Sequence, residues 1–102
     1  NDNDRFKSNK WLTCIYLNQK KINPEAIINE MDKVGIETRR VWKPMHLQPY
    51  YKKFDYVKHS KIDNSKMIFR YGLCLPSGSS LSIKDQNFVI ENLLDIIKKI
   101  NK

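Results

Sequence analysis

The sequence contains few of the residues from which dedicated chemical sites are built. Among its 102 residues are three glycines, two cysteines and two histidines. Three glycines cannot form a glycine-rich phosphate loop, and the distant cysteines and histidines do not match the spacing of a zinc site. No pair of acids is spaced suggestively for hydrolysis, and no Ser/His/Asp spacing supports a nucleophilic triad. The sequence therefore predicts no metal ligands and no catalytic residue.

Long apolar runs are also missing. None approaches the ~20 residues that a helix needs to span a bilayer, and no signal peptide is present. We therefore expect a cytoplasmic protein with no membrane partner. The sequence starts without methionine, at Asn1, which suggests a fragment or a proteolytic or cloning boundary. Residues 1–8 are polar and are expected to form a flexible lead-in to one domain over residues 9–102.

The two cysteines lie far apart in the sequence, and each is inside an apolar run. This spacing does not indicate a disulfide framework or a metal site. We expect Cys14 and Cys74 to be buried free thiols in a reducing compartment.

Acidic residues are outnumbered by basic ones. Nineteen Lys and Arg face eleven Asp and Glu, which gives a net charge of +8. Residues 39–61 hold seven of the cations and one Asp, so +6 of the charge lies in this segment. Such a concentration indicates an anionic partner: a phosphate-bearing ligand, nucleic acid or an acidic protein surface. A solvated, lysine-rich surface explains the same count without any partner.

The first half of the chain predicts a strand, a helix and a second strand. Residues 11–17 are β-branched and aromatic, and their nearly continuous apolarity favours a central strand with both faces covered. A helix is expected to begin at the Asn23 cap, with Pro24 in its first turn, and to end at Gly35. Residues 36–40 follow this helix and are expected to form a strand.

The second half predicts a short helix over residues 63–71, a strand over 73–75 and a final helix. Ser82 and Asp85 resemble a capping box at the start of that last helix. The full order is β-α-β-loop-α-β-α, which indicates an α+β fold with a small three-stranded, mainly antiparallel sheet packed by helices. The helical residues expected to point inward are Met67, Ile68, Tyr71, Val89, Leu93, Ile96, Ile97 and Ile100.

The stretch richest in chemistry is the segment 39–51. It holds three cations, a histidine, three aromatic rings and two prolines. Because Pro44 and Pro49 prevent a continuous helix, we expect an ordered loop. Loops that carry rigid aromatics beside charged groups are more often binding surfaces than packing elements.

Several side chains of this segment are candidates for ligand binding. His46 can donate, accept or stack near neutral pH. Arg39, Arg40 and Lys43 can bind phosphate or carboxylate. Trp42, Tyr50 and Tyr51 can stack on a base or sugar. Each also has an ordinary structural explanation: a histidine that only hydrogen-bonds, a solvated strand end, or a ring that packs the loop. The turn 77–79 can donate to an anion, although a plain turn before a helix is the more common use.

Three blocks extend this interpretation when they are taken in order: NKWLTC (9–14), GIETRRVWKPMHLQP (35–49) and GLCLPSGS (72–79). Together they resemble the C-terminal small domain of the DegT/DnrJ/EryC1/StrS family, the pyridoxal-phosphate-dependent sugar aminotransferases of fold type I. The match covers nearly all of residues 9–100, and its middle block is specific. One departure is Arg40, where family members carry proline; we expect it to change the exit angle of the loop.

The resemblance implies an activity in polysaccharide biosynthesis for the full enzyme, a homodimer in the cytoplasm. A lysine Schiff base holds pyridoxal phosphate, glutamate donates the amino group, and a nucleotide-linked 4-keto-6-deoxy sugar receives it. That lysine lies in a large domain that precedes this segment in family members, so the fragment alone is expected to bind no cofactor and to be inactive. Trp42, Lys43 and His46 would form a substrate-facing wall, with Arg39 beside them.

A protein of another class fits the composition alone: a small basic α+β module that binds nucleic acid. Its basis is the basic segment with interleaved rings, and it predicts salt-sensitive binding to single strands. An interaction or dimerisation domain is a third interpretation. The family resemblance disfavours nucleic acid as a partner. The rings in question are Trp42, Tyr50, Tyr51, Phe54 and Tyr56.

Overall fold

The computed structural model describes residues 5, 7–9, 11–18, 22–57, 60–78 and 80–101. Most of the expected lead-in, residues 1–8, lies outside this part of the chain. The described elements are β1 (Thr13–Tyr16), α1 (Pro24–Lys33), β2 (Arg39–Arg40), two 3₁₀ turns (Met45–Leu47 and Pro49–Tyr51), α2 (Asn64–Tyr71), β3 (Gly72–Leu75) and α3 (Ile83–Ile100).

The described strands form one antiparallel sheet in the order β1-β3-β2, which confirms the predicted α+β class. The prediction of a central first strand with both faces covered is wrong. β1 lies at an edge and most of its residues are exposed, whereas β3 lies in the middle and is largely buried. β3 has only four residues, so its length gave no sign of its central position. Apolar content did not identify the central strand because β1 keeps apolar side chains on an uncovered face.

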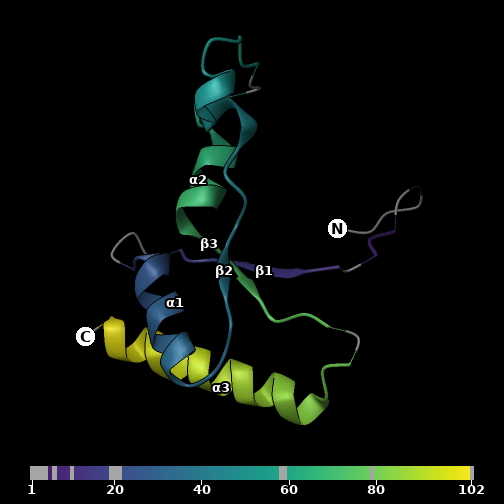
Figure 1. Ribbon diagram of the computed structural model, residues 1–102, viewed down its shortest axis with the longest axis vertical. Helices are drawn as coiled ribbons and strands as arrows, with labels where there is room; N and C mark the ends of the chain where they lie inside the picture. Colours follow the sequence, from purple (N-terminus) through teal and green to yellow (C-terminus); the bar gives the residue numbers. More distant parts are fainter. Residues whose placement is uncertain are drawn as a thin grey trace.

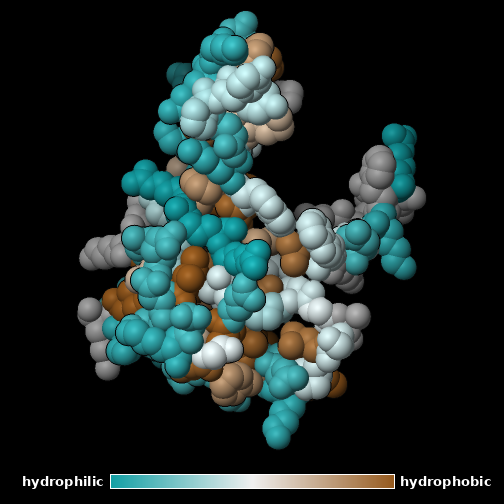
Figure 2. Space-filling view, viewed as in Figure 1, coloured by the Kyte–Doolittle hydropathy of each residue, from teal (hydrophilic) through white to brown (hydrophobic). Residues whose placement is uncertain are grey.

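The hydrophobic core lies between the sheet and the two helices α1 and α3. Ile27 and Met31 of α1 and Leu73 of β3 are fully buried there. Val89, Leu93 and Ile96 of α3 are also buried, as their spacing predicted. Burying each such side chain contributes about 1.5–3 kcal/mol. Figure 1 shows α3 running beneath the sheet beside α1, and Figure 2 shows apolar surface gathered around these two helices.

The predicted helix boundaries are confirmed by their caps. The Asn23 side chain accepts a hydrogen bond from the Glu25 amide at 3.0 Å, and Gly35 after α1 has a φ of 77°. The Ser82 hydroxyl accepts from the Asp85 amide at 3.1 Å at the start of α3. These short polar side chains satisfy amides that the first turn of a helix leaves unpaired.

A second region projects from this sheet-and-helix body. We call it the arm and define it as residues 41–57 together with 60–71, which include α2. In Figure 1 it rises from the sheet as a separate column between β2 and β3. Tyr71 at its base is buried, but Ile68 is 48% exposed, so the prediction that Ile68 points inward is wrong. Because the arm projects away from the sheet (Figure 1), few residues surround the Ile68 side chain, and it stays exposed.

Candidate functional site

The predicted loop is ordered by a series of short turns. Amides of Leu47, Gln48, Tyr51 and Phe54 each donate to a carbonyl three residues earlier, at 3.0–3.1 Å. Pro49 begins the second 3₁₀ turn, where its missing N–H leaves no bond unmade. The two prolines therefore divide the segment into tight turns, as expected of an ordered loop.

His46 is held by two other side chains of the arm. Its Nε2 lies 2.6 Å from Oδ2 of Asp63, and its ring stacks on that of Tyr56 with centroids 3.7 Å apart. The Tyr56 hydroxyl donates to Oδ1 of Asp63 at 3.3 Å. Since Asp63 also caps α2 through the Lys66 amide, this cluster fastens the loop to the start of α2. His46 is thus in place to orient the loop.

Opposing effects act on the pKa of the Asp63 carboxyl in this cluster. Partial burial raises its pKa, but the hydrogen bonds from the Lys66 amide, His46 and Tyr56 favour the carboxylate. The net pKa lies below its ordinary value of 3.8. Asp63 is therefore an anion at neutral pH, and it can accept from the loop and from the helix at the same time.

Trp42 is the most prominent ring of the predicted site. It is 62% exposed and leans on Trp11, which is 66% exposed, with centroids 5.7 Å apart and planes at 30°. Both rings line a groove of about 700 Å³, here called the tryptophan groove, with Arg39 and Phe88 among its other walls. Large exposed aromatic rings beside a cation are well suited to a sugar or base that carries phosphate.

A second hollow of about 590 Å³, here called the arm groove, is lined by Trp42, Lys43, His46 and Tyr56. Trp42 therefore borders both grooves, whereas Arg39 borders the first and Lys43 and His46 border the second. The structure brings the four predicted site residues together around one ring, but it does not place all of them in a single pocket.

The adjacent arginines Arg39 and Arg40 have different surroundings. Arg39 is exposed and pairs with Glu37 at 2.8 Å, so its guanidinium is accessible from solvent. Arg40 donates to the Phe69 carbonyl at 2.8 Å and lies 4.3 Å from the centroid of the Phe69 ring. This carbonyl belongs to the last turn of α2, where carbonyls lack helical partners. Arg40 thus joins β2 to α2 where family members are expected to carry proline.

Lys43 is not shielded from solvent in the way that is usual for a lysine that forms a Schiff base. Lys43 borders the arm groove, and its side chain is exposed. A lysine that forms a Schiff base is usually activated by desolvation or by a neighbouring cation. The described part of the chain also holds no group of three or more metal-ligating side chains and no helix long and apolar enough to cross a membrane.

The turn before α3 forms hydrogen bonds with the ends of two strands of the sheet. The Ser77 hydroxyl accepts from the Thr13 amide at 2.8 Å and donates to the Leu75 carbonyl at 2.9 Å. It thereby extends the β1–β3 pairing by one more contact. Ser79, which was grouped with it as an anion donor, lies outside the described residues.

The rings behind the nucleic-acid interpretation pack largely on each other. Tyr50 and Tyr51 meet edge to face at 5.0 Å, and Phe54 lies 6.1 Å from Tyr51. Lys53 sits over Tyr50 at 4.9 Å, and Tyr56 is stacked on His46. Binding of single strands needs free ring faces on which bases can stack. Tyr50 and Phe54 contact neighbouring rings, yet each is more than half exposed, so the arm keeps ring surface accessible to solvent.

Sequence reasoning missed several partners in this site. Trp11 was assigned to a strand alone, and the contact of Asp63 with His46 was not foreseen. Tyr56 was noted only as one of several aromatic residues. Asp63 stands at the start of the expected helix 63–71, but nothing in the spacing indicates that it binds a histidine 17 residues earlier. Contacts of this kind depend on how the arm folds back on itself.

The cysteines also differ from expectation. Cys74 is buried, but Cys14 is exposed, so the prediction that both are buried is wrong. Both are free thiols, and their sulfur atoms lie 3.3 Å apart. Their distance in the sequence concealed this contact, because β1 and β3 pair directly.

Comparison with known proteins identifies relatives. The model of the DegT/DnrJ/EryC1/StrS aminotransferase family matches residues 1–94. A putative pyridoxal phosphate-dependent aminotransferase, EpsN of Bacillus subtilis (strain 168), is 34% identical over 94 residues. The fold is similar to that of the putative sugar aminotransferase Spr1654 from Streptococcus pneumoniae, with a TM-score of 0.70 for its PMP form and 0.69 for its apo form, at 24% identity.

These relatives are much longer than the present chain. The match with EpsN covers 91% of this chain and 24% of that protein. The match with either form of Spr1654 covers 87% of this chain and 22% of that protein. The chain therefore spans about a quarter of the length of the relatives it matches.

Proposed function

Because the chain belongs to the DegT/DnrJ/EryC1/StrS aminotransferase family, we propose that it forms the substrate-facing wall of a pyridoxal-phosphate-dependent sugar aminotransferase. The observation that carries this proposal is the position of Trp42. Its exposed ring borders two grooves, and each groove has a cation of the predicted site on its border: Arg39 in one and Lys43 in the other.

The proposed substrate is a nucleotide-linked 4-keto-6-deoxy sugar, with glutamate as the amino donor. An aromatic face suits the apolar side of a sugar ring or a base. Arg39 and Lys43 supply positive charge on either side of that face, as a diphosphate requires. His46 holds the loop in position through Asp63 and Tyr56 and also borders the arm groove.

The cofactor and its reactive lysine are proposed to come from a large domain outside this chain. When bound, pyridoxal phosphate supplies the electron sink for amino-group transfer. Exposed apolar side chains just before β1 and on α3 support a missing neighbour, because such surface is normally covered. They include Trp11, Phe88, Ile90 and Leu94. In the full enzyme, assembled as a homodimer, this surface would face other protein.

The decisive experiment separates the two half-reactions in the full enzyme that carries this segment. Trp42→Ala should slow amino transfer to the sugar nucleotide by about 5- to 150-fold, since one stacking contact contributes about 1–3 kcal/mol. Amino transfer from glutamate should change little. Single-turnover absorbance of the cofactor measures both steps. Tyr50→Ala is the control, because Tyr50 is equally exposed but does not line either groove. Equal losses in both half-reactions would contradict the proposal.

His46→Ala in the same enzyme tests the loop more broadly. Loss of the contacts with Asp63 and Tyr56 should impair the sugar half-reaction more than the glutamate half-reaction. Tyr56→Ala, which removes the ring stacked on His46, should reproduce the same bias to a smaller extent. A glutamate half-reaction impaired as strongly as the sugar half-reaction would argue against a substrate-wall role.

The 102-residue chain by itself is expected neither to develop a cofactor absorbance band with pyridoxal phosphate nor to transaminate. The reason is that the reactive lysine is proposed to come from the large domain, and that Lys43, which borders the arm groove, is exposed to solvent. A stable absorbance band after gel filtration would overturn this part of the proposal.

A further inference from the structure

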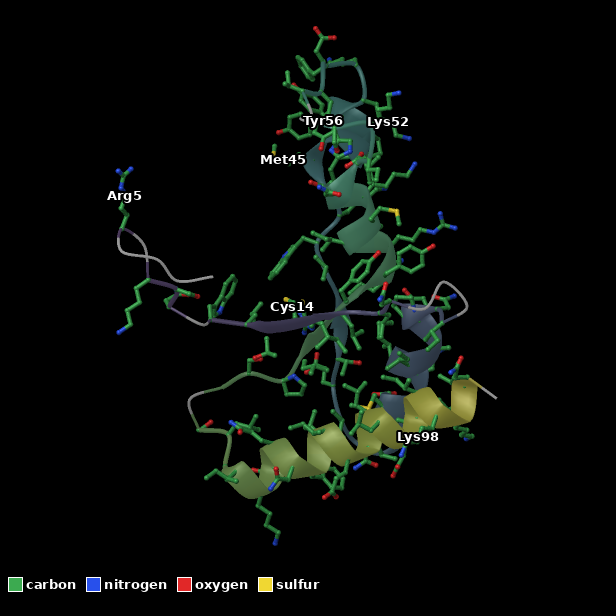
Figure 3. All side chains as sticks on the ribbon, turned by 180° about the vertical axis from the view of Figure 1, so that it is seen from behind. Arg5, Cys14, Met45, Lys52, Tyr56 and Lys98 are labelled. Carbon is green, nitrogen blue, oxygen red and sulfur yellow. The ribbon has the colours of Figure 1, made fainter. Side chains whose placement is uncertain are left out.

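Cys14 and Cys74 face each other across two neighbouring strands. They are register partners in the antiparallel pairing of β1 with β3, and their sulfur atoms are 3.3 Å apart. Ile15 packs against the core and Leu73 lies within it, so alternation places the two thiols on the opposite face of the sheet. Figure 3 shows the Cys14 side chain on the side of β1 that faces away from α3.

The backbone already has the geometry that a disulfide needs. Directly opposed residues of antiparallel strands have Cα atoms about 4.5–5.5 Å apart. Disulfides span Cα separations of about 4.4–6.8 Å, and their sulfur atoms bond at about 2.05 Å. The two sulfur atoms, now 3.3 Å apart, must therefore approach by little more than 1 Å.

The two thiols differ in exposure. Cys14 is exposed, so an oxidant in solution can reach it, whereas Cys74 is buried. Burial, followed by the hydrogen bond with Cys14, raises the pKa of Cys74 to about 11. Because the thiolate is the nucleophile in thiol–disulfide exchange, Cys14 is the residue that reacts first.

We propose that Cys14 and Cys74 are a modification site, which a low-molecular-weight disulfide such as oxidised glutathione converts into a cross-strand disulfide. The Cys14 thiolate attacks one sulfur of the oxidant, forms a mixed disulfide and releases one thiol. Cys74 then loses its proton, attacks the Cys14 sulfur and releases the second thiol. The two cysteines lose two electrons and two protons in total, and the oxidant is reduced to two thiols.

Because Cys14 and Cys74 are register partners, formation of the disulfide between them is favoured over a lasting mixed disulfide on Cys14. Once Cys14 carries the mixed disulfide, Cys74 lies beside it on the next strand, so its attack is intramolecular. The new bond would tie the edge strand β1 to the central strand β3. A crosslink between residues so far apart in sequence restricts the unfolded chain strongly, so the oxidised form should melt at a higher temperature.

The test is intact-mass measurement of the folded chain after incubation with oxidised glutathione. The wild type should lose two hydrogens and remain monomeric, and its melting temperature should rise. Cys74→Ser should instead keep one glutathione adduct, because the attacking thiol is gone. Cys14→Ser should acquire its adduct much more slowly, because Cys74 is buried.

Three results would overturn the proposal: lasting glutathione adducts on the folded wild type, dimers linked by a disulfide, or equally fast adduct formation in the two single variants. The double variant Cys14→Ser/Cys74→Ser controls for the rise in melting temperature, which it should not show. A second control is the wild type in denaturant, where strand pairing is lost and open adducts should accumulate.

Discussion

The body and the arm are built from different interactions. The body buries aliphatic side chains such as Ile27, Met31 and Leu73 between its sheet and two long helices. The arm holds its loop with stacked rings and one polar cluster, and it leaves Met45, Tyr50 and Phe54 more than half exposed. It is attached to the body through Arg40, through the buried Tyr71 at its base and through the continuous chain from α2 into β3.

This difference between body and arm indicates which region determines the stability of the fold and which determines the shape of the two grooves. Burial of apolar surface scales with area and stabilises the body whatever ligand is present. The contacts of the arm are directional and partly exposed, so they fix the shape of the loop while adding less to global stability. Substitutions in the body should therefore act on folding, and substitutions in the arm should act on the shape of the two grooves.

The largest effect is expected for Leu73→Ala in the body. Leu73 is fully buried on the central strand, so the loss should be about 2–5 kcal/mol of unfolding free energy. Denaturant unfolding followed by circular dichroism measures it. Leu94→Ala is the matched control, since Leu94 is 52% exposed on α3 and should cost far less. Similar losses for both variants would remove the basis for placing the core between the sheet and α3.

Gly72→Ala tests the junction between arm and body. A Cβ at this position would collide with the Ile68 carbonyl oxygen and lie 2.7 Å from Cγ2 of Val41. Because backbone cannot yield easily there, we expect a loss of about 1–3 kcal/mol.

Gly78→Ala provides the comparison for this junction, because the nearest atom to its new Cβ would be 3.7 Å away. Its melting temperature should stay close to that of the wild type. If Gly72→Ala melted no lower than Gly78→Ala, the arm would have more freedom at its base than its contacts indicate.

The neighbouring arginines give a sharper test of the attachment. Arg40→Ala should cost about 1–2 kcal/mol, because it leaves the Phe69 carbonyl without its charged donor. Arg39→Ala should change the unfolding free energy by less than about 0.5 kcal/mol, since its pair with Glu37 is exposed. Parallel urea titrations compare the two variants, and equal midpoints would contradict the role given to Arg40.

The smallest effect is expected for Asp63→Asn, in the way that stability falls with pH under acidic conditions. The folded pKa of Asp63 lies below its ordinary value of 3.8, so its contribution is present above that value and is lost as the pH falls through the folded pKa. Asp63→Asn keeps the cap oxygen but removes the charge, so its stability should fall less steeply below about pH 4.

Melting temperatures between about pH 6 and pH 2 measure this slope. Asp55→Asn is the control on the same arm, and it should follow the wild-type slope. If Asp63→Asn lost stability as steeply as the wild type, the cluster with His46 would not hold the loop through charge.

Sequence patterns predicted the body better than the arm. The caps at Asn23 and Ser82 and the apolar stripe of α3 are local signals, and each appeared in the structure where expected. The prediction that β1 lies at the centre of the sheet was wrong, because the order of strands depends on pairing between distant segments. For the same reason the contacts of Trp11 with Trp42 and of Cys14 with Cys74 had no signal in the sequence. Arg39, Trp42, Lys43 and His46 were found from residue type and resemblance, and their binding roles are still predictions.

The position of β3 has a consequence for how the chain folds. β1 and β2 both pair with β3, which comes later in the sequence than either of them. Among the described strands, neither β1 nor β2 therefore has a partner until β3 has been synthesised. α3, which closes the core, comes later still. During synthesis the edge strand β1 therefore stays unpaired until β3 is available, and intermediates with unpaired strands are prone to aggregate. Nucleation through distant strand contacts also makes folding slower than in a helical bundle of similar size.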